Sequence, residues 1–517
     1  MTKQTHNKIS SLLLISALVA FSSCEKDTPR YLEFENYAFT DPDADGGSWT
    51  PVLLNQGSEI GVDAPDAADS EAYQAELAAT KTAMEEATGE QKNAVRYWTA
   101  NPVIRWNEVA LGLIAKYNLI PGPNDDDSYT LPNPANPEGP PSFPFAHPPY
   151  ASRALAYLSV AQFDGLISAW HYKYQYNRVA PYQADETIDY AYEDSDIPSY
   201  PSHEAVIARV SRTILTAMFP LEADYLEALE AEHLESLIIS GGNVASDVEA
   251  GIGIAGEVAQ LALSRASTDG MKDAQTPKAV SDSIKAAAFE RFGWQWENLE
   301  MPPRPVGLTP LFGQVRMWSI DDVESVRPAP PPALDSQEYK DDVEILKEYA
   351  RNATEERRRI ANFWQDGLGT YTPPGHWNRF ANEFIVKYHL NPLQAARTLA
   401  YMNMAIMDSG ISCWDAKYYY HYPRPIQTIA DFKTLAGTPN FPSYTSGHSV
   451  FSAAASEVLA YIFPEEASKV RGWAEEAAIS RVYGGIHWTF DAKVGTEQGR
   501  DVAGYTIARA QADGADQ

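Results

Sequence analysis

Long apolar segments separated by polar turns set the pattern of this chain. Two of them, "ARTLAYMNMAIMDSGISCW" (396–414) and "SVFSAAASEVLAYIF" (449–463), are rich in helix-forming residues and long enough for several turns. Alternating β-branched residues bounded by turn pairs, which would predict strands, are nearly absent. The pattern therefore predicts an all-α protein.

A second regularity is a repeat with an interval of 244 residues, which separates Trp170 from Trp414. Trp106-Asn107 matches Trp377-Asn378 at an interval of 271, and the difference falls in a Pro- and Asp-rich loop after residue 119. Because the same interval separates matching residues over such a long part of the chain, the sequence predicts an internal duplication and hence two pseudo-symmetric helical bundles. Further pairs at the interval of 244 are Arg153 and Arg397, Tyr157 and Tyr401, Asp164 and Asp408, Lys173 and Lys417, Pro181 and Pro425, and Asp247 and Asp491.

The repeat and the local composition predict the domain organisation. The Pro-rich stretch within 301–335 disfavours helix, so we expect an extended covering segment there. The expected parts are a signal peptide (1–24), an acidic, loosely ordered tether (25–84), a degenerate first bundle (85–270), a Pro-rich connecting segment (271–345) and a second, catalytic bundle (346–517).

The N-terminus carries the features of an export signal. Lys3 and Lys8 precede an apolar run (11–23) that is too short to span a bilayer and is typical of a signal peptide. The run ends at Cys24, which resembles the lipidated cysteine of a bacterial lipoprotein, while an ordinary secretory signal is the alternative. We therefore expect an exported lipoprotein of the periplasm or the outer membrane and cell surface, attached to the membrane only through a lipid anchor.

Net charge and cysteine content limit the classes of binding partner and the disulfides that the chain could form. The formal net charge is −30, which argues against nucleic acid, because phosphate binding needs a basic face. An anionic substrate would need a local cluster of cations. After export only Cys413 would remain, so we expect no intrachain disulfide. The sequence leaves the oligomeric state open.

Three short segments of the second bundle supply such a cluster. Arginine forks and a lysine suit a tetrahedral oxyanion, and a helix start preceded by Ser and Gly offers free N–H groups. A His and an Asp four residues apart share one helix face, so the carboxylate could hold one ring nitrogen. The residues are Lys417 and Arg424 in "KYYYHYPRP", Ser446, Gly447 and His448 in "FPSYTSGHSVF", and Arg481, His487 and Asp491 in "SRVYGGIHWTFD".

The order K-x6-R-P, P-S-x-x-S-G-H and S-R-x5-H-x3-D resembles the signature of the superfamily of type 2 phosphatidic acid phosphatases (PAP2) and vanadium haloperoxidases. Tyr444-Thr445 stands between Pro-Ser and Ser-Gly-His, a spacing more similar to the haloperoxidase branch. The segments "FWQDGLGTYTPPGHWN" (363–378) and "LTPLFGQV" (308–315) also resemble segments of bacterial proteins of that branch. The resemblance covers most of the chain from about residue 85 onward.

This resemblance implies a role for each site residue. His487 would bind vanadium directly or, in a phosphatase, attack phosphorus, and Asp491 would orient His487. His448 would be the acid or base. The oxyanion, vanadate in a haloperoxidase, would be held by Lys417, Arg424, Ser446, Gly447 and Arg481.

Three functions follow as hypotheses. The first is a vanadium-dependent haloperoxidase that takes hydrogen peroxide and a halide and carries vanadate as its cofactor. The alternative is an exported acid phosphatase that cleaves phosphate monoesters through a phosphohistidine and needs no cofactor. The third is a non-catalytic surface lipoprotein, against which the complete charged set argues. The duplicated two-bundle organisation favours the first, and neither the halide nor the ester can be read from the sequence.

The first bundle serves as an internal comparison. Lys173, Ser202 and Asp247 stand at the positions of Lys417, Ser446 and Asp491. The other site positions differ. With two guanidinium groups lost and a carboxylate gained, the first bundle would repel an oxyanion rather than hold it. We therefore expect a structural first bundle, in which the replacements are Ala180 for Arg424, His203 for Gly447, Glu204 for His448, Leu237 for Arg481 and Asn243 for His487.

Overall fold

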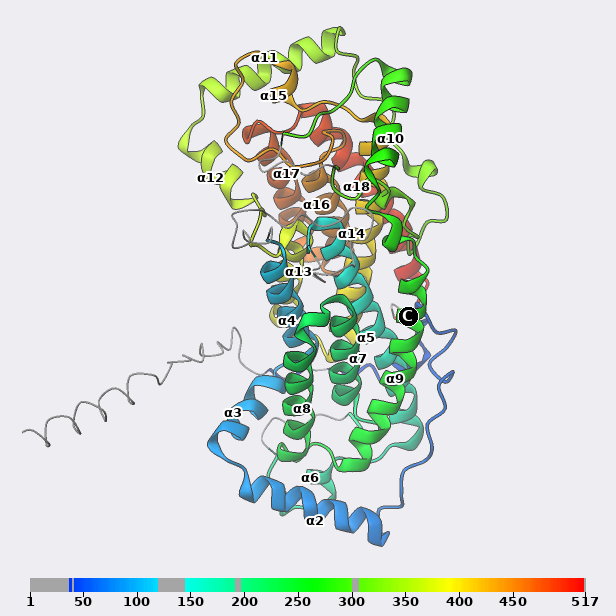
Figure 1. The fold of residues 1–517 in the computed structure, drawn as a ribbon. Coiled ribbons are helices and arrows are strands. Elements are labelled where there is room, and N and C mark those ends of the chain that lie inside the picture. Colours follow the sequence, from blue (N-terminus) through cyan, green and yellow to red (C-terminus); the bar gives the residue numbers. More distant parts are fainter. Residues whose placement is uncertain (1–36, 40, 120–144, 191–196, 300–305, 516–517) are drawn as a thin grey trace, which may run out of the picture. The chain divides into compact units, whose positions relative to one another are not determined.

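The described part of the protein is helical throughout. The computed structural model describes residues 37–39, 41–119, 145–190, 197–299 and 306–515, which contain no strand, so the predicted all-α class is confirmed (Figure 1). The α-helices are α2 (Glu71–Glu86), α3 (Gly89–Trp98), α4 (Pro102–Tyr117), α5 (Pro148–Tyr176), α6 (Pro181–Ala184), α7 (His203–Met218), α8 (Ala223–Ile239), α9 (Ala245–Ser267), α10 (Lys278–Phe292), α11 (Gln337–Arg351), α12 (Glu355–Phe363), α13 (Thr372–Lys387), α14 (Pro392–Tyr420), α15 (Pro425–Thr428), α16 (Gly447–Ile462), α17 (Ala467–Tyr483) and α18 (Thr489–Gln511). The 3-10 helices are η1 (Gly46–Ser48), η2 (Pro220–Glu222), η3 (Met271–Asp273), η4 (Phe312–Gln314), η5 (Val323–Val326) and η6 (Pro464–Glu466).

Two sets of helices repeat each other in order and in length. α5 and α14 both have 29 residues and begin 244 residues apart. The same interval relates both ends of α6 to α15, α7 to α16, α8 to α17 and α9 to α18. The repeat read from the sequence thus coincides with the helix boundaries, while a common origin by duplication stays a prediction.

The two sets meet along α5 and α14, which pack against each other (Figure 1). Asn107 donates to its counterpart Asn378 (Nδ2 to Oδ1, 2.9 Å), and Asn403 donates to its counterpart Ser159 (Nδ2 to Oγ, 3.0 Å). A contact between equivalent positions lies close to a two-fold axis. These buried amide contacts therefore mark a pseudo-two-fold relation between the two sets of helices.

Each central helix fixes a covering segment through one buried carboxylate. Asp164 on α5 accepts hydrogen bonds from the backbone N–H groups of Val52 (2.8 Å), Leu53 (2.6 Å) and Leu54 (2.9 Å). Its counterpart on α14, Asp408, accepts from the N–H groups of Trp318 (2.7 Å) and Ser319 (2.8 Å). The sequence repeat places these two aspartates at equivalent positions, and in the structure each accepts hydrogen bonds from the backbone of a covering segment.

The stretch expected as a loose tether therefore differs from the expectation over its described part. Trp49 and Leu54 are buried, and the Asp164 carboxylate satisfies three backbone groups of this stretch. The helix α2 follows within the same range, with Ser70 as its N-cap. A charge-rich composition suggested disorder, but a few apolar side chains and one buried acceptor are enough to fix the segment.

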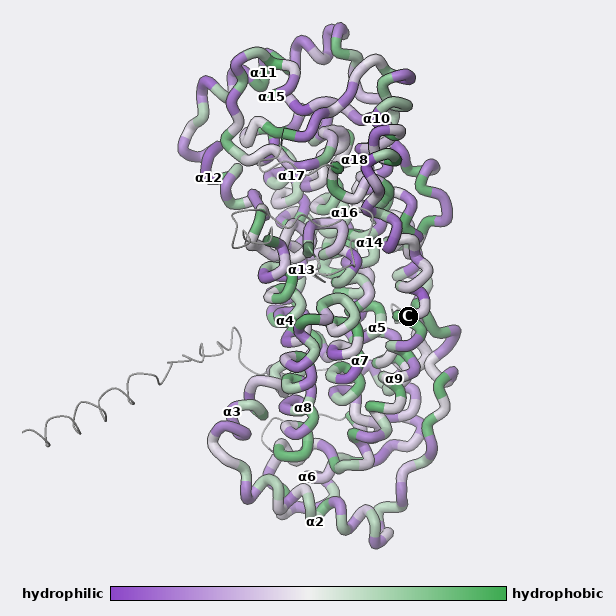
Figure 2. Tube along the Cα trace, viewed as in Figure 1, coloured by the Kyte–Doolittle hydropathy of each residue, from purple (hydrophilic) through white to green (hydrophobic). Residues whose placement is uncertain are grey.

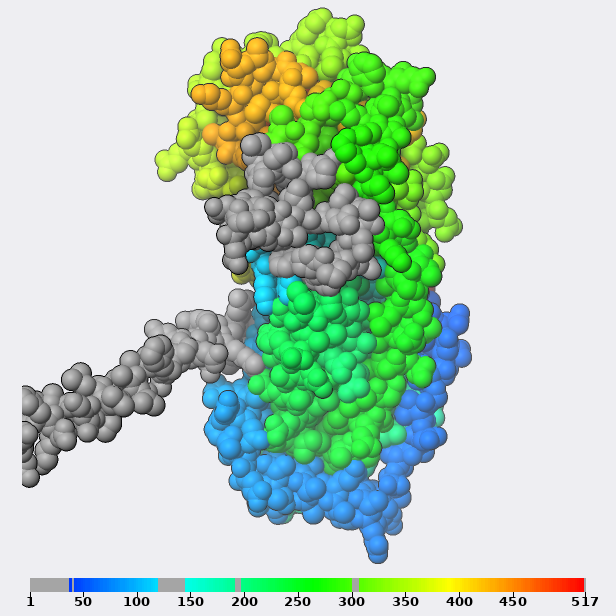
Figure 3. All heavy atoms as spheres, in the orientation of Figure 1, coloured from blue at the N-terminus to red at the C-terminus, as the bar shows by residue number. Residues whose placement is uncertain are grey.

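Part of the Pro-rich connecting segment lies against the second bundle. The carbonyls of Pro328 and Pro332 accept hydrogen bonds from the hydroxyls of Tyr420 (2.6 Å) and Tyr422 (2.8 Å). Two helices that the sequence reading did not anticipate lie within residues 271–345, α10 entirely and α11 with its first part. Figure 3 shows α10 (green) and the loop after α15 (orange) as neighbouring parts of one face of this bundle.

Polar residues concentrate in the peripheral elements. Figure 2 shows the hydrophilic character of α12, whose sequence is EERRRIANF.

Among the described residues no helix is both long enough and apolar enough to cross a membrane. Cys413 is a buried free thiol. The predicted signal peptide and Cys24 lie outside the described residues.

Candidate active site

The five helices α14 to α18 and the segments between them bring the predicted residues together at one end of the second bundle. Lys417 lies in the last turn of α14, and Arg424 directly precedes α15. Ser446 is the N-cap of α16, which begins with Gly447 and His448. The last three residues are Arg481 in α17, His487 in the loop that follows it, and Asp491 in the first turn of α18.

His487 and Asp491 form the pair that the sequence predicts. The distance from His487 Nδ1 to Asp491 Oδ2 is 2.8 Å, and only 2% of the His487 side chain is exposed. Arg424 Nη1 lies 2.9 Å from His487 Nε2. Because a guanidinium can only donate, Nε2 must be the acceptor and Nδ1 must carry the proton. The geometry therefore fixes one tautomer, with the Nε2 lone pair turned toward the cationic residues.

The charge state of His487 follows from the same surroundings. Burial, followed by the neighbouring Arg424 and Lys417, holds the pKa of His487 well below its usual value. Burial raises the pKa of Asp491, while hydrogen bonding from Ser443 and the nearby Lys417 and Arg424 act in the opposite direction. His487 is thus neutral at physiological pH, which is the form that can bind a metal or attack an electrophile.

Lys417 is held by backbone carbonyls. Its Nζ donates to the carbonyls of Pro442 (3.0 Å), Ser443 (2.9 Å) and Thr445. In the first bundle Lys173 donates to the carbonyls of Pro198 and Ser199, the counterparts of Pro442 and Ser443. Lys173 makes these bonds in a bundle that lacks the two arginines of the site. The bonds therefore stabilise the fold and do not depend on oxyanion binding. Lys417 therefore supports the loop before Ser446 in addition to contributing positive charge.

The two arginines are buried cations that both act electrostatically on His487. Arg424 donates from Nε (3.2 Å) and Nη2 (3.0 Å) to the carbonyl of Phe441, and Arg481 donates to the carbonyl of Ala361. Burial lowers the pKa of each guanidinium to about 10, so both stay charged at neutral pH. They give this end of the bundle a positive potential within an acidic protein.

The start of α16 completes the group. Ser446 Oγ caps the helix by accepting from the N–H of Ser449. A Cβ added to Gly447 would meet only ordinary contacts, 3.8 Å from Trp414 and 3.9 Å from Phe451. Protein packing therefore does not require the glycine, and its free backbone can approach a bound group closely. His448 Nε2 is buried and has no hydrogen-bond partner within the described residues, as expected of an atom that faces a ligand.

A second His–Asp pair next to His448 was missed in the sequence reading. Asp366 accepts a hydrogen bond from His376 (Nδ1 to Oδ1, 3.0 Å), and its Oδ2 lies 3.9 Å from His448 Nε2. Asp366 also acts electrostatically on Arg481. Both residues lie in "FWQDGLGTYTPPGHWN", which was noted only as a similar segment. The signal available was a carboxylate and a histidine close together in one Gly-rich segment, Asp366 before α13 and His376 within it.

The arrangement defines a class of protein, and comparison with known proteins supports it. Residues 397–512 match the sequence model of the PAP2 superfamily, and this range includes all eight predicted site residues. This part of the second bundle thus matches the PAP2 superfamily, and the predicted enzyme class is confirmed at this level.

The particular relatives are vanadium haloperoxidases. A solved bacterial vanadium-dependent iodoperoxidase is 25% identical, with a TM-score of 0.55, covering 70% of this chain and 91% of that one. A solved bacterial vanadium-dependent chloroperoxidase in its holo form is 15% identical, with a TM-score of 0.50 over 72% of this chain and 95% of that one, and this likeness concerns the fold alone. The vanadium chloroperoxidase of Curvularia inaequalis is 26% identical over 135 residues, which is 19% of this chain and only 22% of that protein's length. The resemblance to the haloperoxidase branch is confirmed.

Asp491→Asn tests the support of His487. We expect the activity to fall about 10- to 100-fold, because the amide removes the charge that holds the Nδ1–H tautomer. Asp247→Asn is the matched control. Asp247 is the counterpart in the first bundle and accepts from Val244 N–H (2.9 Å) as Asp491 accepts from Trp488 N–H (3.2 Å). Turnover per folded molecule is measured for both, and an equal loss in both variants would contradict the role of Asp491.

Proposed function

We propose that the protein is a vanadium-dependent haloperoxidase, which oxidises a halide with hydrogen peroxide. The observation that carries this proposal is the two-set helical architecture, which matches 91% of a solved iodoperoxidase chain. The active-site geometry supports it, because a neutral imidazole whose Nε2 lone pair faces Arg424 and two buried guanidinium groups suit a metal oxyanion. Export as a lipoprotein through Cys24 is part of the same proposal.

The residues present fit vanadate. His487 Nε2 would be the ligand to vanadium, and Arg424, Arg481, Lys417, Ser446 and the Gly447 N–H would hold the oxygens. Two observations favour a bound group here: the buried His448 Nε2 has no hydrogen-bond partner within the described residues, and packing does not require a glycine at position 447. Bound vanadate supplies an electrophilic centre that activates peroxide toward a halide.

The chain itself supplies charge, orientation and a proton acceptor. Arg424 must exchange its bond to His487 Nε2 for one to the oxyanion, which frees the lone pair at the moment the anion is held. Burial and the nearby Arg481 hold the pKa of His448 well below its usual value, so this imidazole is neutral and can accept a proton at Nε2. Hydrogen bonds to the carbonyls of Trp364 and Gln365 raise the His448 pKa in part and keep the ring in place.

The same site favours one second candidate, a phosphomonoesterase. His487 Nε2 would attack phosphorus, the ester P–O bond would break, and His448 in its protonated form would give a proton to the leaving alcohol. Water would then hydrolyse the phosphohistidine. The superfamily match supports this candidate as well, because vanadate and phosphate are both tetrahedral oxyanions.

A paired assay separates the two functions. The purified mature protein is supplied with orthovanadate, hydrogen peroxide and bromide or iodide, and halogenation of an indicator is followed. In parallel, release from a chromogenic phosphate monoester is measured without vanadate. We expect halogenation that depends on vanadate. Robust phosphate release without halogenation of either halide would replace the proposal by the phosphatase, and inactivity in both assays would refute both.

A further inference from the structure

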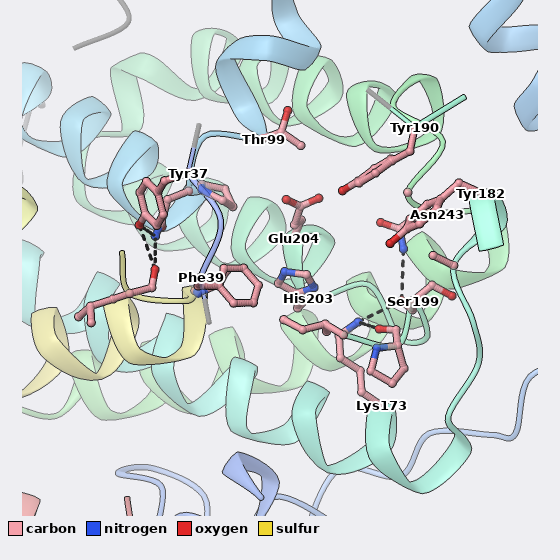
Figure 4. A pocket seen from close by; sticks show the side chains of 18 of the residues that line it. Tyr37, Phe39, Thr99, Lys173, Tyr182, Tyr190, Ser199, His203, Glu204 and Asn243 are labelled. Atoms are coloured by element: carbon pink, nitrogen blue, oxygen red, sulfur yellow. Dashed lines mark hydrogen bonds between the residues drawn. The ribbon is translucent and has the colours of Figure 1, made fainter. Parts of the chain in front are cut away.

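The first set of helices contains a cavity of about 610 Å³, large enough for a small organic molecule. It lies where α5 ends and α7 begins, the counterpart of the active site in the second set. Leu390 and Pro392 of the second half also line it, so it lies beside the junction of the two sets. Figure 4 shows its charged and polar lining, from Lys173, His203, Glu204 and Asn243.

The cavity cannot be a second oxyanion site. Ala180 occupies the position that Arg424 has in the active site. The Lys173 ammonium donates hydrogen bonds to the carbonyls of Pro198 and Ser199. The Asn243 amide donates to the Ser199 carbonyl (3.2 Å), and its oxygen accepts from Ser202 Oγ (3.1 Å). Burial and the neighbouring Lys173 hold the pKa of His203 well below its usual value, so this imidazole brings no positive charge.

Glu204 is the acidic group of the cavity, and it has no hydrogen-bond or ion-pair partner within the described residues. Figure 4 shows its carboxylate facing the space between Thr99 and Tyr190. Within the described residues it takes part in no hydrogen bond or ion pair, and Lys173 acts on it only through the electrostatic field. Burial raises the pKa of Glu204 to about 7. A half-buried carboxylate without a donor is less well stabilised than one in water, and a ligand that carries a donor or a cation would reduce that cost.

Aromatic rings form much of the remaining wall. Tyr37 and Phe39 line one side, and Tyr182 and Tyr190 stack on each other with their ring centroids 4.3 Å apart. Aromatic faces attract cations and accommodate flat apolar groups. Arg96 also contributes to the lining, but it belongs to the exposed side of α3. The inner wall therefore combines one acceptor of positive charge with an apolar, aromatic enclosure.

We propose that this cavity is a second binding site, distinct from the active site, for a small organic amine with an aromatic or apolar body. The ammonium group would contact the Glu204 carboxylate, and the body would lie against Tyr37, Phe39 and the stacked pair Tyr182 and Tyr190. The proposal does not depend on which reaction the second bundle catalyses. It extends the expectation of a purely structural first bundle, because the residues at the positions of the oxyanion-binding ones line a cavity that favours a cation instead.

Calorimetric titration of the full-length mature protein with tyramine tests the proposal. We expect saturable binding, and we expect Glu204→Gln to weaken it about tenfold or more, because the charge-assisted hydrogen bond is lost. The matched ligands 3-(4-hydroxyphenyl)propionate and 4-hydroxyphenethyl alcohol keep the ring but replace the ammonium by a carboxylate or a hydroxyl. Both are expected to bind at least tenfold more weakly than tyramine.

Two further variants keep the test decisive. Glu227→Gln removes the same charge from an exposed position on α8 and should leave tyramine affinity unchanged. Thr99→Arg brings a cation to the half-buried position opposite Glu204 and should reduce the affinity about tenfold even if Glu204→Gln fails to fold, which circular dichroism reveals. The proposal is overturned if tyramine shows no saturable binding, if the propionate binds equally well, or if folded Glu204→Gln and Thr99→Arg both bind tyramine as the parent protein does.

Discussion

His487→Ala is expected to abolish vanadate-dependent halogenation, with a loss on the order of 10³-fold or more. The imidazole provides the only proposed bond from the protein to the metal, and the cations around it can hold an oxyanion but cannot replace a ligand. The measurement is the initial rate of halogenation at saturating vanadate, peroxide and halide. In the parallel phosphatase assay the same variant loses the nucleophile, so any phosphate release should disappear as well.

The control for this variant is His171→Ala. His171 follows Trp170 on α5, is half-buried, and lies in the first set of helices. Removal of this imidazole should leave the rate within about twofold, since it is far along the chain from the site and lines no part of it. If His487→Ala retained more than a tenth of the halogenation rate, His487 could not be the vanadium ligand.

Arg424→Gln is expected to weaken vanadate binding by about 10²- to 10³-fold, the usual effect of removing one preorganised donor from a buried anion site. Glutamine cannot supply the charge or the fork of donors that links Phe441, Ile486 and His487. The affinity is measured as the vanadate concentration that restores half of the activity to protein freed of vanadate. Arg424→Lys should recover part of the loss, because it returns the charge but not the fork.

Arg471→Gln is the matched control for Arg424. Arg471 also belongs to the second set, but its guanidinium pairs with Glu457 at the surface (Nη2 to Oε2, 2.6 Å), and 47% of its side chain is exposed. Such pairs contribute little, and vanadate affinity should not change. Equal loss in both variants would mean that net charge, rather than contact with the oxyanion, controls binding.

The eight site residues could be read from the sequence because their chemistry is local. Lys417, Arg424 and His487 stand in short motifs whose spacing survives any rearrangement of the surrounding helices. The helix boundaries were predictable for a similar reason, since the repeat of 244 residues aligns α5 with α14 and α7 with α16.

Contacts between distant segments could not be predicted in this way. Asp366 meets His448 across 82 residues of chain, and nothing in its own loop shows which histidine it faces. Asp164 accepts hydrogen bonds from three backbone N–H groups that lie more than 100 residues away in the sequence. The cavity at Glu204 depends on Tyr37 and Leu390, which approach the first set of helices from two other parts of the chain. These features depend on tertiary packing, to which a single sequence gives little access.

The Asp164 interaction also determines where the enzyme can be shortened. A protein trimmed to the start of the first bundle at residue 85 would lose the N–H groups of Val52, Leu53 and Leu54 and would leave a fully buried carboxylate without those donors. Any shortened version should therefore begin well upstream of residue 52 and keep the covering segment intact. The usable boundary of the catalytic unit lies in a stretch that composition alone would discard.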